Sequence, residues 1–284
     1  MFWLFSCHGS FISQVFSANH PGGGRTGYYL RKYIRPFAIY GLIGWLIKGI
    51  VKCVGEDCSV YAFLKYTLKA FVLHGSVHGN GALWFLLTLF FVRLAADYVL
   101  PKVHPLVVAL VCMLIAAAHY CLADSHTPWY FGNFFSGLCF FSLGNYFRKH
   151  EQNKYVVIAA IVVFASFVVL YLTGIMEYSY FYFHKNTISK GNYLLFYPIA
   201  LSGIIVTNNF FRKAYDYWKF PLFSYIGRNA MTFYVTHWIV LVVARFVFPQ
   251  QLHIQSAKCL FLLYALSCAV CLPIINVIIN SIKK

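Results

Sequence analysis

Acidic residues are scarce in this sequence, and charge of either sign is low overall. Only 7 of the 284 residues are Asp or Glu, and all charged residues together make up 11% of the chain. No carboxylate falls deep inside an apolar segment, which disfavours a proton-coupled transporter that relies on intramembrane Asp or Glu. Hydrophobic residues make up 61% of the chain and mean hydropathy is +0.67, which excludes an ordinary water-soluble domain.

Signature motifs of soluble enzymes are also missing. The sequence has no Gly-x-Ser-x-Gly, no His-Glu-x-x-His and no dinucleotide-binding fingerprint. Most of the nine cysteines lie in apolar segments, where a thiol behaves as a small hydrophobic group. Cys268 and Cys271 have CxxC spacing without a second pair nearby, so we expect neither a metal site nor a bound cofactor.

Long apolar runs take the place of these motifs and predict an all-α, polytopic transmembrane bundle with about nine spans. We expect a single domain over residues 1–284, with residues 61–74 as an interfacial helix between the second and third spans. The expected spans are 1–16, 36–54, 82–100, 105–123, 131–147, 155–174, 192–211, 224–248 and 257–279.

The basic residues lie between the apolar runs, as the positive-inside rule requires, rather than in runs that bind nucleic acid. Placing residues 17–35 in the cytosol puts 15 of the 23 Lys and Arg residues there, together with the C-terminus. Nine spans then put Met1 outside. Met1 opens directly into an apolar run without a charged flank, so an outside N-terminus predicts a further helix before Met1. The alternative is a chain whose N-terminus is outside. We expect the cell membrane, in particular a bacterial inner membrane.

Residues 223–248 carry the most informative ionisable side chain. His237 lies about nine residues beyond Arg228, roughly 13 Å along a helix and near the middle of a bilayer core about 30 Å thick. Tyr234, His237 and Arg245 fall within about 80° of one another on a continuous helix, which predicts one polar stripe. A histidine at that depth is a functional hypothesis.

Two other polar segments have open interpretations. Arg31, Lys32 and Arg35 precede Pro36, where we expect a helix to begin, and would bind the phosphates of a soluble donor or simply orient the chain. Residues 74–86 include His78 and Trp84, and they would line an external substrate mouth or form a turn before an interfacial tryptophan.

His8 is a further lone ionisable group, inside the first span. It belongs to the first of four segments that, in order, resemble the membrane-bound acyltransferase 3 family. Residues 1–9 resemble its FFxxSG helix, 31–37 its basic motif before a proline, 83–90 its WFLxxLF span and 225–237 its IGxxSxxxYxxH helix. Lys32 stands where the family has an arginine, and the family's catalytic histidine on its first helix has no counterpart here.

The resemblance implies transfer of an acyl group, usually acetyl, from cytosolic acyl-CoA to a hydroxyl of a surface carbohydrate or its lipid-linked precursor. In this chain it implies donor binding by Arg31, Lys32 and Arg35. In the family pattern the base belongs to the helix without a counterpart here, which makes His237 a supporting residue; in this chain His237 or His8 would substitute as the general base. Tyr234 or Trp84 would stabilise the oxyanion. We assign Trp84 and His78 to substrate binding. The alternatives are a transporter of a lipid-linked glycan and an inactive, truncated acyltransferase remnant.

Overall fold

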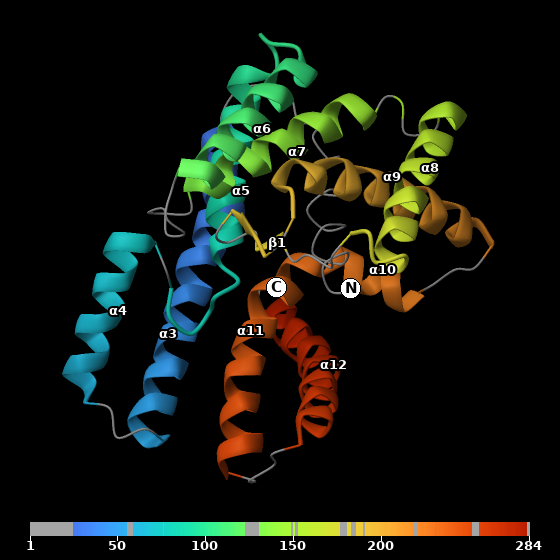
Figure 1. Ribbon diagram of the computed structural model, residues 1–284. Helices are drawn as coiled ribbons and strands as arrows, with labels where there is room; N and C mark the ends of the chain where they lie inside the picture. The colour runs from blue at the N-terminus through green and yellow to red at the C-terminus, as the bar shows by residue number, and fades with distance from the viewer. Residues whose placement is uncertain are drawn as a thin grey trace. The chain divides into compact units, whose positions relative to one another are not determined.

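The protein is described by a computed structural model, whose helices are drawn in Figure 1. The structure describes residues 25–55, 59–75, 77–122, 131–148, 150, 153–176, 181–182, 186–189, 191–217, 221–251 and 256–282. His8 and the expected first span lie outside these residues. The described chain is almost entirely helical, and its regular β-structure is one antiparallel pair, β1 (Phe181–Tyr182) and β2 (Thr187–Ile188).

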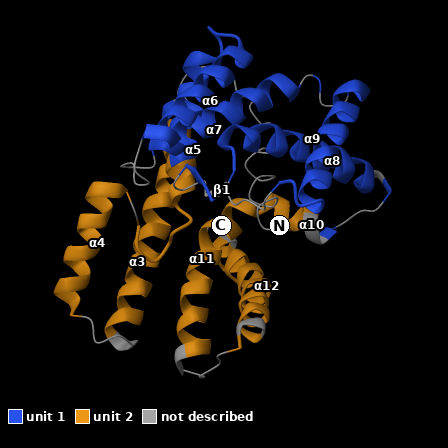
Figure 2. Ribbon diagram, in the orientation of Figure 1, with its two compact units in different colours: residues 1–26, 88–221 blue, residues 27–87, 222–284 orange. Residues whose placement is uncertain are grey.

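The helices group into two compact units, coloured separately in Figure 2. The first unit contains residues 88–221, and the second contains residues 27–87 and 222–284. Helix α5 (Trp84–Val99) begins in the second unit and continues into the first. The chain thus leaves the second unit in the middle of one helix and returns to it at α10 (Pro221–Arg228).

Six helices of the described chain are long and apolar enough to cross a membrane, which makes this a membrane protein. They cover residues 26–53, 105–122, 154–172, 193–215, 230–249 and 259–279. The expected spans 82–100 and 131–147 correspond to α5 and α7 (Phe131–Arg148), which are not among the six. Both are rich in buried residues, so protein rather than lipid surrounds much of their surface. The count of nine spans is not confirmed.

The helix around the basic cluster begins before Pro36, so the expected start at that proline was wrong. Helix α2 (Arg25–Tyr29), a π-helical turn η1 (Leu30–Ile34) and α3 (Arg35–Gly55) follow without a break. The N–H of Arg35 donates to the carbonyl of Leu30, five residues back. A proline ring crowds the carbonyl four residues before it, and the wider π turn immediately before Pro36 accommodates this.

Helix α4 (Val60–His74), which the sequence predicts to be interfacial rather than membrane-crossing, is not among the six candidate spans and packs along α3. Trp45 donates from its indole Nε1 to Thr67 Oγ1 at 2.9 Å and packs on the ring of Phe63 at 5.7 Å. Gly49, one turn after Trp45, also faces Phe63. As α3 advances from Trp45 to Gly49, its partners on α4 move from Thr67 back to Phe63. The two helices are therefore antiparallel.

The predicted continuous helix over residues 224–248 is broken at Asn229. Helix α10 ends at Arg228, and α11 (Ala230–Phe246) begins after Asn229, which has φ −105° and ψ 13°. The Asn229 side chain donates to the carbonyl of Tyr225 at 2.9 Å and shares that oxygen with its own backbone N–H at 3.2 Å. A π-helical turn η5 (Val247–Gln251) follows α11, and α12 (Ala257–Ile282) packs against both.

Helices α3 and α11 pack against each other and run in the same direction in Figure 1, while α4 and α12 run back. The start of α3, with its basic cluster, and the start of α11 therefore lie toward the same end of the second unit. Hydrogen bonds within each helix satisfy its backbone, as the interior of a bilayer demands.

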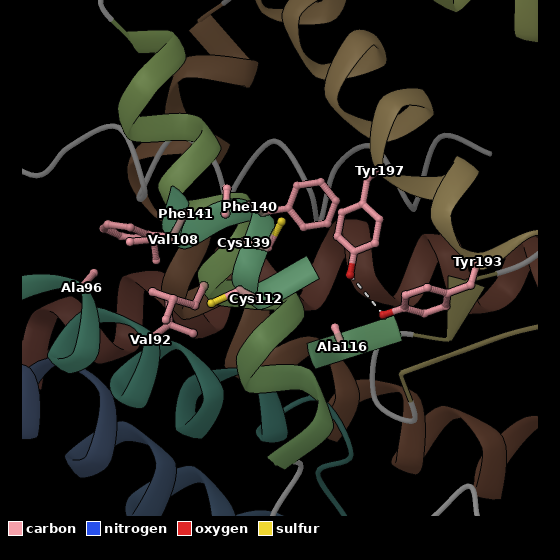
Figure 3. Packing of buried hydrophobic residues seen from close by; sticks show 12 residues of the cluster. Val92, Ala96, Val108, Cys112, Ala116, Cys139, Phe140, Phe141, Tyr193 and Tyr197 are labelled. Atoms are coloured by element: carbon pink, nitrogen blue, oxygen red, sulfur yellow. Dashed lines mark hydrogen bonds between the residues drawn. The ribbon is translucent and has the colours of Figure 1, made fainter. Parts of the chain in front are cut away.

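The first unit is built on the pair α6 (Pro105–Leu122) and α7, with α8 (Lys154–Leu172) against α9 (Phe196–Tyr217). A short 3-10 helix, η4 (Tyr193–Leu195), leads into α9. Figure 3 shows its core, where Cys112 of α6 and Cys139 of α7 lie near Phe140 and Tyr197. Gly and Ser residues of α7 are buried in this packing, as is usual where membrane helices approach closely.

A polar cluster of Ser136, Asn186, Tyr193 and Tyr197 lies beside this core. Asn186 accepts from Ser136 Oγ and from the Tyr193 hydroxyl, both at 2.6 Å, and donates to the carbonyl of Ala116 at 3.1 Å. The Tyr193 and Tyr197 hydroxyls are 3.0 Å apart (Figure 3). Asn186 adopts the left-handed conformation, with φ 51°, which asparagine tolerates better than most residues. These bonds fix Asn186, the residue before β2, to α6 and α7.

Candidate active site

The candidate site lies within the second unit, where the segment 77–83 is inserted between α3 and α11. Asn80 is fully buried, and its Nδ2 donates to the carbonyl oxygen of Val235 at 2.8 Å. A Cβ placed on Gly44 would come within 2.9 Å of the Asn80 Cβ. Gly44 lies at the middle of α3, so the segment packs against the middle of that helix and not beyond its end. Residues 78–79 and 81–83 form turns directly before Trp84, as one of the two interpretations of the sequence predicted, and the substrate mouth stays a prediction.

Three glycines make this insertion possible. Gly79 has φ +92°, and a Cβ on it would overlap the carbonyl oxygen of Gly44. A Cβ on Gly81 would lie 3.1 Å from the indole ring of Trp238 on α11. Only a hydrogen fits at Gly79, and a Cβ on Gly81 would require the Trp238 ring to shift, so the backbone of the segment lies close to both helices. The sequence Gly79-Asn80-Gly81 was the signal for this, and from the sequence alone it predicts part of a substrate mouth or of a turn before Trp84.

Tyr234 ties α11 to the start of α5. Its hydroxyl donates to the carbonyl oxygen of Ala82 at 2.6 Å, and its ring packs on Phe85 with centroids 5.1 Å apart. A phenol carries a single proton. Tyr234 must therefore release Ala82 before it can donate to an oxyanion, and in this arrangement it acts as an anchor.

His237 lies one turn beyond Tyr234 near the middle of α11, with the two rings 5.7 Å apart. Its Nδ1 is 2.6 Å from the Tyr234 carbonyl oxygen. A carbonyl can only accept, so Nδ1 carries a proton, and in the neutral ring Nε2 is then the proton-accepting nitrogen. This is the tautomer that a general base needs.

The predicted polar stripe on α11 is only partly present. Tyr234 and His237 are neighbours, but the exposed guanidinium of Arg245 lies over the ring of Trp238, 5.6 Å from its centroid. Arg245 therefore pairs with an aromatic ring on the adjacent side of the helix.

The basic cluster has a defined geometry at the start of α3. Arg31 and Arg35 are exposed, and Lys32 between them is half-buried. The Lys32 Nζ lies 5.4 Å from the ring centroid of Tyr28 and 5.6 Å from that of Tyr33. Two aromatic rings thus hold one ammonium in place, while two guanidinium groups one turn apart face outward.

Trp84 and His78 occupy opposite ends of the inserted segment. Trp84 is the first residue of α5, half-buried against Phe85 with rings 6.0 Å apart. His78 packs edge-on against Tyr66 of α4 at 4.8 Å. Partial burial, together with the charges of Lys52 and Lys48, lowers the pKa of His78 below its ordinary value. His78 is therefore neutral at neutral pH.

The structure brings Tyr234 and His237 together, and joins Tyr234 to Trp84 through Phe85. Arg31, Lys32 and Arg35 form a separate group at the start of α3, and His78 lies near Lys48 and Lys52 toward the other end of that helix. His8 lies outside the described residues. Asn80 and Gly44 were not recognised as site-building residues from the sequence.

Comparison with known protein families gives one match. A family model described as an acyltransferase domain matches residues 3–278. No curated protein and no solved structure shows significant similarity to the chain. The family match spans nearly the whole sequence, so this membrane protein belongs to the acyltransferase 3 family.

Proposed function

We propose that the protein transfers an acyl group, acetyl in the simplest case, from cytosolic acyl-CoA to a hydroxyl of a cell-surface carbohydrate or its lipid-linked precursor. Membership of the acyltransferase 3 family supports acyl transfer. The observation that carries the proposal is the hydrogen bond from His237 Nδ1 to the Tyr234 carbonyl, which presents Nε2 as a base inside an apolar helix.

In this mechanism Nε2 of His237 takes the proton of the acceptor hydroxyl as its oxygen attacks the thioester carbonyl. The carbon–sulfur bond then breaks, the acyl group stays on the acceptor oxygen, and the imidazolium returns the proton to the CoA sulfur. Charge and protons balance without a metal or a redox group. His8 is the alternative base, to be tested by the same substitution as His237.

Donor binding is assigned to Arg31, Lys32 and Arg35. Guanidinium groups bind phosphate through paired N–H donors, and an ammonium adds a point charge. The cluster is suited to the phosphates of CoA because its three cations lie within one turn of helix, with Lys32 already held between two rings.

Stabilisation of the oxyanion is assigned to the first turn of α5, beside Tyr234. The start of a helix carries a partial positive charge, which favours a developing anion, and here the N–H groups of Phe85 and Leu86 already bond the carbonyls of Ala82 and Leu83. Trp84, the first residue of this helix, is the proposed substrate contact, and His78 in neutral form is a second one. Tyr234 would add a donor only if substrate binding breaks its bond to Ala82.

The donor assignment is tested with a charge-matched pair of double variants. Lys32→Ala with Arg35→Ala should weaken binding of acetyl-CoA by at least about ten-fold, since each lost phosphate contact removes a charged hydrogen bond. Lys65→Ala with Lys69→Ala removes two exposed cations from α4 of the same unit and should leave affinity unchanged. Equal affinity for both double variants would show that the cluster only orients the chain.

The base is tested by transfer of radiolabelled acetyl from acetyl-CoA to membrane glycans. His237→Gln should reduce the rate by about 10²- to 10⁴-fold, the usual contribution of a general base. Affinity for acetyl-CoA should persist, and the exposed His104→Gln serves as the control. A His237→Gln protein that transfers acetyl at the unmodified rate would exclude His237 as the base.

A further inference from the structure

Arg93 is a buried cation that the acyl-transfer site does not use. It lies within α5, in the part that belongs to the first unit, and only 5% of its surface is exposed. Val92 and Ala96 beside it on the helix belong to the hydrophobic core. From the sequence, Arg93 counted only as one more cation marking the cytosolic side.

Within the described part of the chain, the contact given for the Arg93 guanidinium is an aromatic ring and not a carboxylate. Its guanidinium carbon lies 4.8 Å from the ring centroid of Phe141 on α7. Its Nε is fully buried and has no hydrogen-bond partner among the described residues. Asp97, one turn further along α5, therefore does not bond this nitrogen. A ring face attracts a cation only weakly compared with the cost of burying an unpaired ion.

Other polar groups on the same two helices are also unsatisfied. Thr88 of α5 and Ser142 of α7 are buried, and neither hydroxyl has a hydrogen-bond partner in the described part of the chain. Buried polar groups in proteins are nearly always bonded, so these unsatisfied groups on α5 and α7, which meet at Arg93 and Phe141, indicate a missing partner. The chain has few anions of its own to supply one, with 7 acidic against 23 basic residues.

We propose that Arg93 binds an oxyanion of the phosphate type, supplied by a phospholipid headgroup or by free phosphate. A guanidinium offers paired N–H donors that match phosphate oxygens. Arg93 lies six residues, about 9 Å, from the end of α5 at Val99. The turn after Val99 is exposed and carries Lys102, so a phosphate at this end meets a second cation.

The test uses the full chain, purified in maltoside micelles and stripped of phospholipid, with the thermal unfolding midpoint as readout. Phosphatidylglycerol and inorganic phosphate are titrated separately, and a galactosyl diacylglycerol with the same acyl chains is the phosphate-free control. We expect a saturable rise in the midpoint with phosphatidylglycerol, with phosphate or with both, and none with the galactolipid. A response to the lipid alone identifies the headgroup as the source, and a response to both identifies free phosphate as sufficient.

Two arginine variants decide whether Arg93 is the site. Arg93→Gln should weaken the apparent affinity by at least ten-fold, whereas Arg148→Gln removes the same charge from an exposed position on α7 and should respond like the unmodified protein. If Arg93→Gln does not fold, Arg93→Lys is the second variant, because it keeps the positive charge but lacks the paired N–H donors of a guanidinium. It should show an intermediate loss of affinity, measured as the amount of phospholipid retained in native mass spectrometry. Unchanged affinity in the Arg93 variants, or no response to either phosphate source, would overturn the proposal and leave Arg93 as a stacking residue only.

Discussion

Asn80 Nδ2 donates to the carbonyl oxygen of Val235 across 155 residues of sequence, joining the segment before α5 to the middle of the second unit. The bond is buried, and the opposite atom of the same amide, Oδ1, has no partner among the described residues. The carbonyl of Val235 belongs to α11, two residues before His237. This hydrogen bond therefore helps to set the position of segment 77–83 along α11, relative to the candidate base His237.

Replacing Asn80 by Ala should destabilise the second unit. The substitution removes the donor to Val235 and leaves a small void, at a cost of about 1 kcal/mol or somewhat more. Thermal unfolding in detergent would measure this, with the exposed Asn145→Ala in α7 of the first unit as the comparison. An Asn80→Ala protein with an unchanged midpoint and unchanged acetyl transfer would show that the bond positions nothing.

The contact between Gly79 and Gly44 is tested by a matched pair of glycine substitutions. Gly79 and Gly191 have similar positive φ values, +92° and +84°, but a Cβ on Gly191 meets nothing within 4 Å. Gly191→Ala should cost only the conformational penalty of about 1–2 kcal/mol. Gly79→Ala adds a collision with the Gly44 backbone, so we expect it to reduce the yield of folded protein severely. Similar stability in both variants would contradict the close packing.

The depressed pKa of His78 predicts a pH dependence of stability. The folded protein favours the neutral ring because of partial burial and the charges of Lys52 and Lys48, whereas the unfolded chain titrates near the ordinary value of about 6.5. The unfolded state therefore binds more protons as the pH falls through 6.5, and stability should decline on the acidic side. His78→Gln should reduce this decline, and the exposed His104→Gln should not. Unfolding midpoints between pH 5 and 8 give the comparison.

The polar cluster of the first unit should behave as a cooperative group. Tyr193→Phe removes a donor to Asn186, and Ser136→Ala removes another, each at about 1 kcal/mol. Because both donors bond the same Oδ1, the double variant should differ from the sum of the single ones. A double-mutant cycle of thermal stabilities measures the coupling, and strict additivity would show that the two bonds are independent.

The apolar runs of the sequence predict the bounds of several helices but not the local breaks within them. The bounds of α6, α7 and α8 agree with the expected spans to within about two residues, because a continuous apolar run ends where polar residues begin. The break at Asn229 and the π turn before Pro36 were missed, since each depends on one local hydrogen bond that leaves no mark on hydropathy. The prediction of a single domain over the chain stays a prediction.

The sequence by itself determined that this is a helical membrane protein, which of its apolar runs form helices, and that it resembles the acyltransferase 3 family. The first two properties follow from composition and from the order of residues along each helix, and the resemblance depends on four short motifs. Only the tertiary structure decided that Gly79 and Asn80 contact the middle of α3 and that Tyr234 bonds the carbonyl of Ala82. It likewise decided that the guanidinium of Arg93 faces the ring of Phe141. Each of these depends on where two distant segments meet, which is set by side-chain shape and by unsatisfied polar groups.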